Sequence, residues 1–171
     1  MLIVFSGLPG SGKTTLARQL ASKRSATYLR IDSIEHALRT SSPGSDIGPA
    51  GYVVALAIAG GNLSLGMAVV ADCVNPVAES RAAWRELARA SAAPHLDIEI
   101  VCSDKAEHRR RVEQRRSDIP GFVVPDWASV ETHDYQPWTG DRLVIDTALL
   151  SIEDALCLIE GRLASLMRSG D

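Results

Sequence analysis

The stretch GLPGSGKT, residues 7–14, restricts the possible folds of this chain more than any other feature. It follows a short apolar run, Leu2 to Phe5, and it opens a segment with helical character, Lys13 to Lys23. The stretch satisfies the pattern G-x-x-x-x-G-K-[ST] without mismatch, and between a strand and a helix this pattern is typical of a phosphate-binding loop. We therefore expect an α/β protein that binds a nucleotide.

The residues of this loop have separate physical roles. The glycines let the backbone curl so that successive N–H groups point at phosphate oxygens, and the following helix presents its positive end to them. Lys13 is expected to contact the β and γ phosphates, and the Thr14 hydroxyl is expected to join the coordination shell of Mg²⁺. The residues expected to contact the nucleotide are Gly7, Pro9, Gly10, Ser11, Gly12, Lys13, Thr14 and Thr15.

Composition indicates one soluble domain. The chain has 171 residues, of which 46% are hydrophobic and 23% charged, so we expect a single domain over residues 1–171. A net charge of −3 disfavours non-specific attraction to nucleic acid or to an anionic membrane. The three cysteines are widely spaced and no apolar run reaches 18 residues, so we expect a cytoplasmic protein with no membrane contact. None of these sequence features indicates the oligomeric state of the protein.

Strand-like and helix-like segments alternate along the chain, which favours a parallel sheet covered by helices on both faces. The predicted strands are Leu2–Phe5, Thr27–Ile31, Met67–Ala71, Ile98–Cys102 and Leu143–Ile145. The predicted helices are Lys13–Lys23, Ser33–Arg39, Ala50–Leu63, Glu79–Ser91, Lys105–Arg116 and Ile152–Met167.

A long insertion, about residues 117–140, interrupts this alternation before the last strand. It contains Phe122, Trp127, Tyr135 and Trp138, and a long aromatic loop in a compact domain is more often functional than accidental. We expect a lid whose aromatic side chains, with the helix Ala50–Leu63, enclose a substrate.

Polar residues at the carboxyl ends of the strands are the candidates for chemistry, because ligands of open parallel sheets bind there. Asp32 follows the second strand, where it either caps a helix or accepts the proton of an attacking hydroxyl. Asp72 ends an apolar run and is expected to reach either the metal-water shell or the acceptor. Asn75 and Arg81 line the acceptor pocket or shape the turn.

A basic segment, Lys105–Arg116, leads into the insertion. It is either a solvated helix face or a source of lid arginines that stabilise charge on a transferring phosphoryl group. Arg111 and Arg115 are four positions apart and are the leading candidates, followed by Arg116. Asp146 ends the last strand, where the loop of such a sheet usually passes near the purine base.

Several of these segments together resemble the zeta-toxin-like and AAA_33-type P-loop kinases, which include chloramphenicol phosphotransferase, gluconate kinase and polynucleotide 5′-kinase domains. The segments are Gly7–Thr15, Arg30–Glu35, Val69–Pro76, Arg111 with Arg115, and Val144–Ala148. The resemblance implies an adenylate-kinase-like core with a three-layer, five-stranded sheet of order 2-3-1-4-5. It also implies MgATP as phosphoryl donor, Asp32 as general base, and Arg111 and Arg115 as lid arginines.

The predicted function is transfer of the γ-phosphoryl group of MgATP to a hydroxyl of a small molecule, a metabolite or an antibiotic. One alternative is a nucleotide-hydrolysing regulatory switch, but the chain lacks the Asn-Lys-x-Asp signature of GTPases. The other is a nucleic-acid 5′-end kinase. It is disfavoured by the net charge and by Ser33, Ile34 and Glu35, which stand where polynucleotide kinases carry an arginine. No basic residue for an acceptor carboxylate is evident near Asp32. The acceptor is not readable from the sequence, and the choice of ATP over GTP depends on the resemblance.

Overall fold

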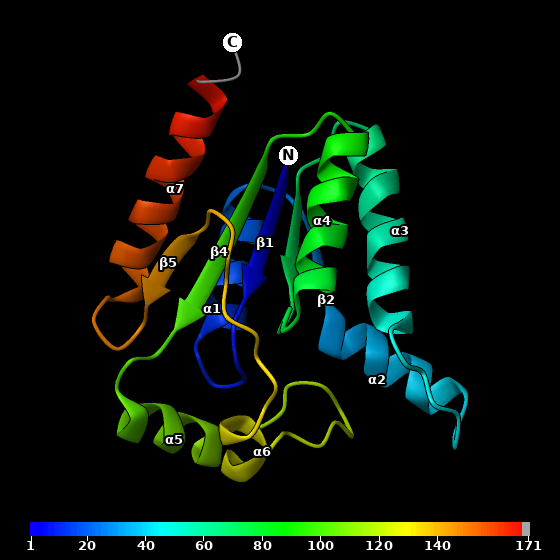
Figure 1. Cartoon of the computed structure of the whole chain (residues 1–171), viewed down its shortest axis with the longest axis vertical. Helices are drawn as coiled ribbons and strands as arrows, with labels where there is room; N and C mark the ends of the chain where they lie inside the picture. Colours follow the sequence, from blue (N-terminus) through cyan, green and yellow to red (C-terminus); the bar gives the residue numbers. More distant parts are fainter. Residues whose placement is uncertain (169–171) are drawn as a thin grey trace.

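Strands and helices alternate in the computed structural model, which describes residues 1–168 (Figure 1). The strands are β1 (Leu2–Ser6), β2 (Thr27–Arg30), β3 (Val69–Asp72), β4 (His95–Val101) and β5 (Leu143–Asp146). The helices are α1 (Lys13–Lys23), α2 (Ile31–Ser41), α3 (Ala50–Ser64), α4 (Ala78–Ala90), α5 (Lys105–Gln114), α6 (Trp127–Glu131) and α7 (Ile152–Arg168).

All five strands form one parallel sheet in the order β2-β3-β1-β4-β5. The central strand β1 pairs with β3 on one side and β4 on the other, and Leu2 lies opposite both Val69 and His95. Every residue of β1 is buried, as the continuous apolar run predicts for a strand covered on both faces. The predicted class, sheet and strand order are therefore confirmed.

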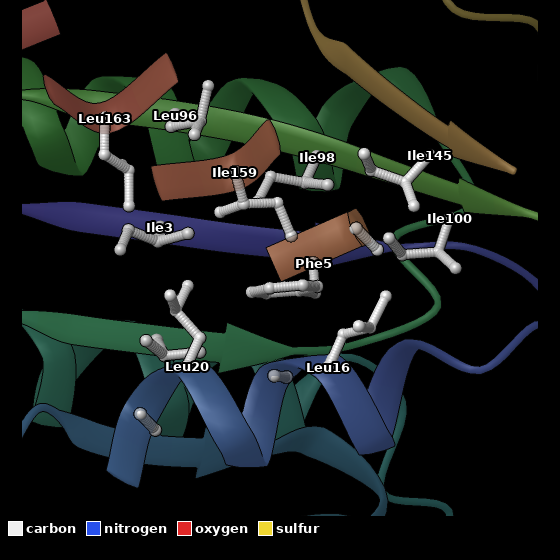
Figure 2. Close-up of a cluster of buried hydrophobic side chains, with 14 residues drawn as sticks. Ile3, Phe5, Leu16, Leu20, Leu96, Ile98, Ile100, Ile145, Ile159 and Leu163 are labelled. Carbon is white, nitrogen blue, oxygen red and sulfur yellow. The ribbon is translucent and has the colours of Figure 1, made fainter. Parts of the chain in front are cut away.

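Helices cover both faces of the sheet and make three layers. Ile3 and Phe5 of β1 point toward the layer of α1 and α7, where they pack with Leu16 and Ile159 (Figure 2). The alternate residues of β1 point to the other face and pack against α3 and α4, where Trp84 is fully buried. The carboxyl ends of the strands lie at one end of these layers, beside α2, α5 and α6 (Figure 1).

Several element boundaries differ from the predicted ones by one to three residues. Strand β4 begins at His95 and not at Ile98, because Asp97 interrupts the apolar pattern although it is buried and bonded to Arg85 at 2.9 Å. Helix α5 ends at Gln114 and not at Arg116, so Arg115 has an extended backbone and does not share a helical face with Arg111. The short helix α6 inside the insertion was not predicted.

The aromatic residues of the insertion do not act together as the wall of a substrate site, which corrects the predicted enclosure. Trp127 packs on His108, with ring centroids 5.4 Å apart. Tyr135 and Trp138 lie under the guanidinium of Arg81, at 5.0 and 4.3 Å. Phe122 alone of the four lines the cavity that contains Asp32.

Candidate active site

The loop between β1 and α1 has a backbone that requires glycine. Gly7 and Gly10 have φ angles of 143° and 82°, in the left-handed region that side chains disfavour. A Cβ atom on Gly7 would collide with the carbonyl oxygen of Ile100, and one on Gly10 would collide with the side chain of Val112. Because β4 and α5 approach the loop this closely, a residue larger than glycine does not fit at position 7 or 10.

Two side chains of the loop retain unused hydrogen-bonding capacity. Lys13 is only 5% exposed, and its Nζ makes one long contact, 3.5 Å, with the carbonyl oxygen of Leu8. It forms no ion pair with any carboxylate among residues 1–168. The hydroxyl of Ser11 is buried without a hydrogen-bond partner. Buried donors that lack partners are costly unless a ligand satisfies them, so this set fits the phosphates of a nucleotide.

Helix α5 and the turn after β5 hold the loop from outside. The Nε2 atom of His108 lies 2.8 Å from the carbonyl oxygen of Pro9. Arg111 donates from Nη1 to the Thr147 hydroxyl at 2.8 Å, and this hydroxyl donates to the carbonyl oxygen of Ser11 at 2.7 Å. The first predicted lid arginine therefore lies against the loop and positions it through Thr147.

Two of the cavities beside the loop share Gly12, Thr15 and Arg111. The larger, the cationic cavity, has a volume of 480 Å³. Its lining comprises Gly10, Gly12, Lys13, Thr14, Thr15, Arg18, Arg30, Arg110, Arg111, Gln114, Arg115 and Asp118. The α7 cavity, 340 Å³, is more apolar and includes Leu16, Leu150 and Ala155. The polarity of the cationic cavity suits the phosphates of a nucleotide, and the adjoining, more apolar α7 cavity suits its base.

Asp32 lines a third space, the α2 cavity, which has a volume of 220 Å³. Its carboxylate lies 3.5 Å from Nη2 of Arg30 and 4.0 Å from Nη2 of Arg115, and Arg115 lines the cationic cavity as well. Asp32 is the second residue of α2 and caps no amide, so it is not the helix cap. The structure therefore brings Asp32 and Arg115 to the boundary between the cationic and α2 cavities.

Asp72 lies at the end of β3 and is buried. The Tyr28 hydroxyl donates to its Oδ2 at 2.7 Å, and Nε of Arg30 lies 4.0 Å from the same oxygen. Burial and the neighbouring carboxylate raise the pKa of Tyr28 well above its usual value, so this hydroxyl stays a donor. Within the described chain Oδ1 of Asp72 and the Thr14 hydroxyl make no hydrogen bond. Both fit Mg²⁺, which takes most of its other ligands from water and phosphate.

Other predicted residues lie elsewhere. Arg116 is exposed and lines none of these cavities. The carboxylate of Asp146 accepts hydrogen bonds from the Ser103 and Ala148 amides and so stabilises the turn after β5. Asp146 does not line any of these cavities. The exposure of Arg116 and the contacts of Asp146 therefore give no support to the roles predicted for these two residues.

Arg81 shapes a turn and does not line a substrate pocket. It is 3% exposed, and its guanidinium donates to four carbonyl oxygens from two segments of the chain. These carbonyls belong to Asn75, Pro76, Gln136 and Pro137. Asn75, whose φ is 53°, bonds Ser6 through its amide nitrogen at 3.0 Å. Of the two interpretations that the sequence left open, the contacts favour the structural one for both residues.

Sequence reasoning missed Arg18, Arg30 and Asp118. Arg30 is 4% exposed and lies 2.8 Å from Asp118, which also lies 2.6 Å from Arg18. One signal was available, because a charged residue stands inside the apolar run of β2 and such a residue needs a partner. The partner could not be read from the sequence, since 88 positions separate the two residues.

Comparisons with known proteins agree with this architecture. The sequence profile of the AAA_33 family, described as an AAA domain, matches residues 2–125. No curated protein sequence matches significantly. No helix within residues 1–168 is long and apolar enough to cross a lipid bilayer.

Several solved structures share the fold. A presumed kinase from Chloroflexus aurantiacus superposes with a TM-score of 0.74 at 20% identity, and 96% of each chain is covered. Kti12 from Chaetomium thermophilum, in complex with ADP-AlF3, has a TM-score of 0.68 at 20% identity, with 94% of this chain and 98% of that chain covered. A gluconokinase from Sinorhizobium meliloti has a TM-score of 0.63 at 20% identity, with 97% and 91% covered.

Proposed function

The chain belongs to the AAA_33 family, and from this premise we propose that it transfers the γ-phosphoryl group of MgATP to a hydroxyl of a small molecule. The observation that supports this most is the position of Asp32. Its carboxylate lies between a cationic cavity beside the phosphate-binding loop and a separate, partly apolar cavity beside α2. A base in that position faces a donor on one side and an acceptor on the other.

The loop and α5 supply charge to the donor side. Bound MgATP supplies the electrophilic γ-phosphoryl group. Lys13, whose ammonium is buried without a carboxylate partner, neutralises phosphate charge, and the loop amides orient the phosphates. Thr14 and Asp72 hold Mg²⁺, directly or through water. Arg115 stabilises the negative charge that moves during transfer, and Arg111, which lines the same cavity, adds positive charge while it positions the loop through Thr147.

Asp32 works on the acceptor side. It accepts the proton of the attacking hydroxyl, and Arg30 and Arg115 hold its carboxylate in position. Val74, Phe122, Pro125 and Val130 supply apolar walls that exclude competing water. The fold shared with a gluconokinase and with a protein solved with ADP-AlF3 supports phosphoryl transfer, and it leaves the acceptor open.

The test is ADP release from MgATP by the purified protein, alone and with pools of sugars, sugar acids, nucleosides and hydroxylated antibiotics. We expect one pool to stimulate ADP release and to yield a phosphorylated product. Asp32→Asn should keep MgATP affinity within a few-fold while turnover falls at least about a hundredfold, the usual contribution of a general base. Asp134→Asn, an exposed carboxylate without a partner in residues 1–168, is the charge-matched control.

The same assay separates the second candidate, a nucleotide-hydrolysing switch. Kti12 supports that candidate, because a similar fold holds ADP-AlF3 in a protein whose description names no kinase activity. Steady ADP release that no pool changes, with no phosphorylated product and with an unaltered rate in Asp32→Asn, would favour the switch over the transferase.

A further inference from the structure

A carboxylate fills a position between two arginines in the cationic cavity. The Oδ2 atom of Asp118 lies 2.6 Å from Nη2 of Arg18, and its Oδ1 lies 2.8 Å from Nη1 of Arg30. The two oxygens of one carboxylate therefore each meet a different guanidinium. This is the geometry in which arginines recognise a planar or tetrahedral anion.

The cavity around this pair is strongly cationic. Arg30 is 4% exposed, and its Nε atom, 4.0 Å from Oδ2 of Asp72, is buried without a hydrogen-bond partner. The cavity has six cationic lining residues, and Asp118 is its one acidic lining residue. The cationic residues are Lys13, Arg18, Arg30, Arg110, Arg111 and Arg115. Such an excess of positive charge draws anions into a cleft.

Asp118 can leave this position without disturbing the core. It belongs to the insertion after α5, its side chain is 41% exposed, and the turn around it is closed by the Ser117 hydroxyl. Arg18 and Arg30, in contrast, are carried by α1 and β2, which are packed into the layers of the fold. Arg30, which is 4% exposed, is therefore fixed, whereas the side chains of Arg18 and Asp118, 52% and 41% exposed, are free to adjust to a ligand.

The position lies in the same cavity as the loop that would hold the nucleotide phosphates, but on the β2 side of that cavity. Arg18 lies over the ring of Tyr28 at 5.9 Å, and Tyr28 and Arg30 belong to β2, the outermost strand on this side. The loop follows β1, and β3 lies between the two strands. Arg30 also lies 3.5 Å from Asp32, so the Arg18–Arg30 pair adjoins the candidate base.

We propose that Arg18 and Arg30 bind an anionic group, a carboxylate or a phosphate ester, on the phosphoryl acceptor, and that Asp118 occupies this position when no acceptor is bound. The inference rests on the proposed function, because it assigns the class of acceptor to the same site. An acceptor of this class carries its anionic group beside Arg30 and presents its hydroxyl to Asp32. When the acceptor binds, its anionic group replaces the Asp118 carboxylate beside Arg18 and Arg30. The residues around Asp118 are then free to move.

The experiment measures binding of inorganic phosphate by calorimetry in the presence of saturating Mg·AMPPNP, which occupies the nucleotide site. Asp118→Asn removes the internal competitor and should bind phosphate about tenfold more tightly than the unsubstituted protein. Adding Arg18→Met to Asp118→Asn should reverse that gain, and thermal unfolding checks that each variant is folded. Asp134→Asn makes the same charge change in the insertion at a residue without an arginine partner and should bind phosphate like the unsubstituted protein.

The outcomes are distinct. Unchanged phosphate affinity in Asp118→Asn would overturn the proposal, as would phosphate that competes with AMPPNP, because the anion would then belong to the nucleotide site. In the ADP-release screen, with a pool of phosphorylated sugars added, stimulation by sugar acids or phosphorylated sugars supports the proposal, and stimulation only by neutral compounds overturns it. Failure of AMPPNP to bind and absence of ADP release would instead count against the proposed function, whatever the phosphate affinity.

Discussion

Replacing Lys13 with methionine should have opposite effects on folding stability and on nucleotide binding. Lys13 is 5% exposed, and its ammonium has only one long contact, with a carbonyl oxygen. In the unliganded protein this buried charge is poorly compensated and therefore lowers the free energy of unfolding. Methionine has a similar length and no charge. Removing the desolvation cost should raise the free energy of unfolding by about 1–2 kcal/mol and the Tm by about 2–8 °C.

Nucleotide affinity should fall in the same variant. Loss of a charge-assisted contact with phosphate costs about 2 kcal/mol, which corresponds to about a 30-fold weaker Kd. At MgATP near a hundredfold excess over the unsubstituted protein's Kd, binding stabilises that protein by about 2.7 kcal/mol. The Lys13→Met protein under the same conditions should gain only about 0.9 kcal/mol.

Thermal unfolding with and without MgATP, together with calorimetric binding, measures both effects. Lys23→Met on the same helix is the matched control, because Lys23 is 63% exposed and its 3.8 Å ion pair with Glu160 should contribute little. Its Tm and its nucleotide affinity should stay near those of the unsubstituted protein. An unliganded Lys13→Met protein that is clearly less stable would refute the argument that Lys13 is buried for a ligand.

Three further substitutions test other contacts. Arg115→Ala should lower kcat about a hundredfold and change MgATP affinity less, since the arginine is assigned to charge that develops during transfer; a change in Tm alone would leave it a structural residue. Arg81→Met should cost about 3–4 kcal/mol and lower the Tm by roughly 10 °C, because four carbonyls lose one buried donor, whereas the exposed Arg89→Met should change the Tm little. Hydrogen bonds from two arginines lower the pKa of Glu107 from 4.5 to about 2, so its contribution to stability is complete above pH 4.5 and is lost as the pH falls toward 2. The Tm difference between Glu107→Gln and the unsubstituted protein should shrink over that range and stay constant above it.

The layers of the fold were predictable because they depend on local patterns. Short apolar runs that end in polar residues indicate strands buried on both faces, and the predicted bounds of α1 agree with the structure. The strand order came from the resemblance, since periodicity does not say which strands are neighbours. The start of β4 was missed because Asp97 breaks the apolar run, and only the contact with Arg85 shows how its charge is accommodated.

The candidate site was predictable where one segment carries the chemistry. The phosphate-binding loop and Asp32, which follows β2, were both predicted from residues close together in the sequence. Arg30 and Asp118 meet across 88 positions, and the insertion carries no periodic pattern that would indicate where its residues lie. Arg81 could not be assigned from the sequence, because burial and four carbonyl partners are properties of the packed chain.

The second half of the insertion is held to the rest of the fold, which leaves its first part open to replacement. Arg81 ties residues 136 and 137 to the turn after β3, and Lys105 pairs with Glu131 at 2.5 Å, which ties α6 to α5. Residues 117–125, which lie between α5 and α6 and precede both anchors, carry Asp118, Phe122 and Pro125 into the cavities without contributing to the sheet. Doubling the length of such a span costs only about 0.6 kcal/mol in closure entropy. Libraries confined to residues 117–125 should therefore change which acceptor is used while the core and the nucleotide loop keep their stability.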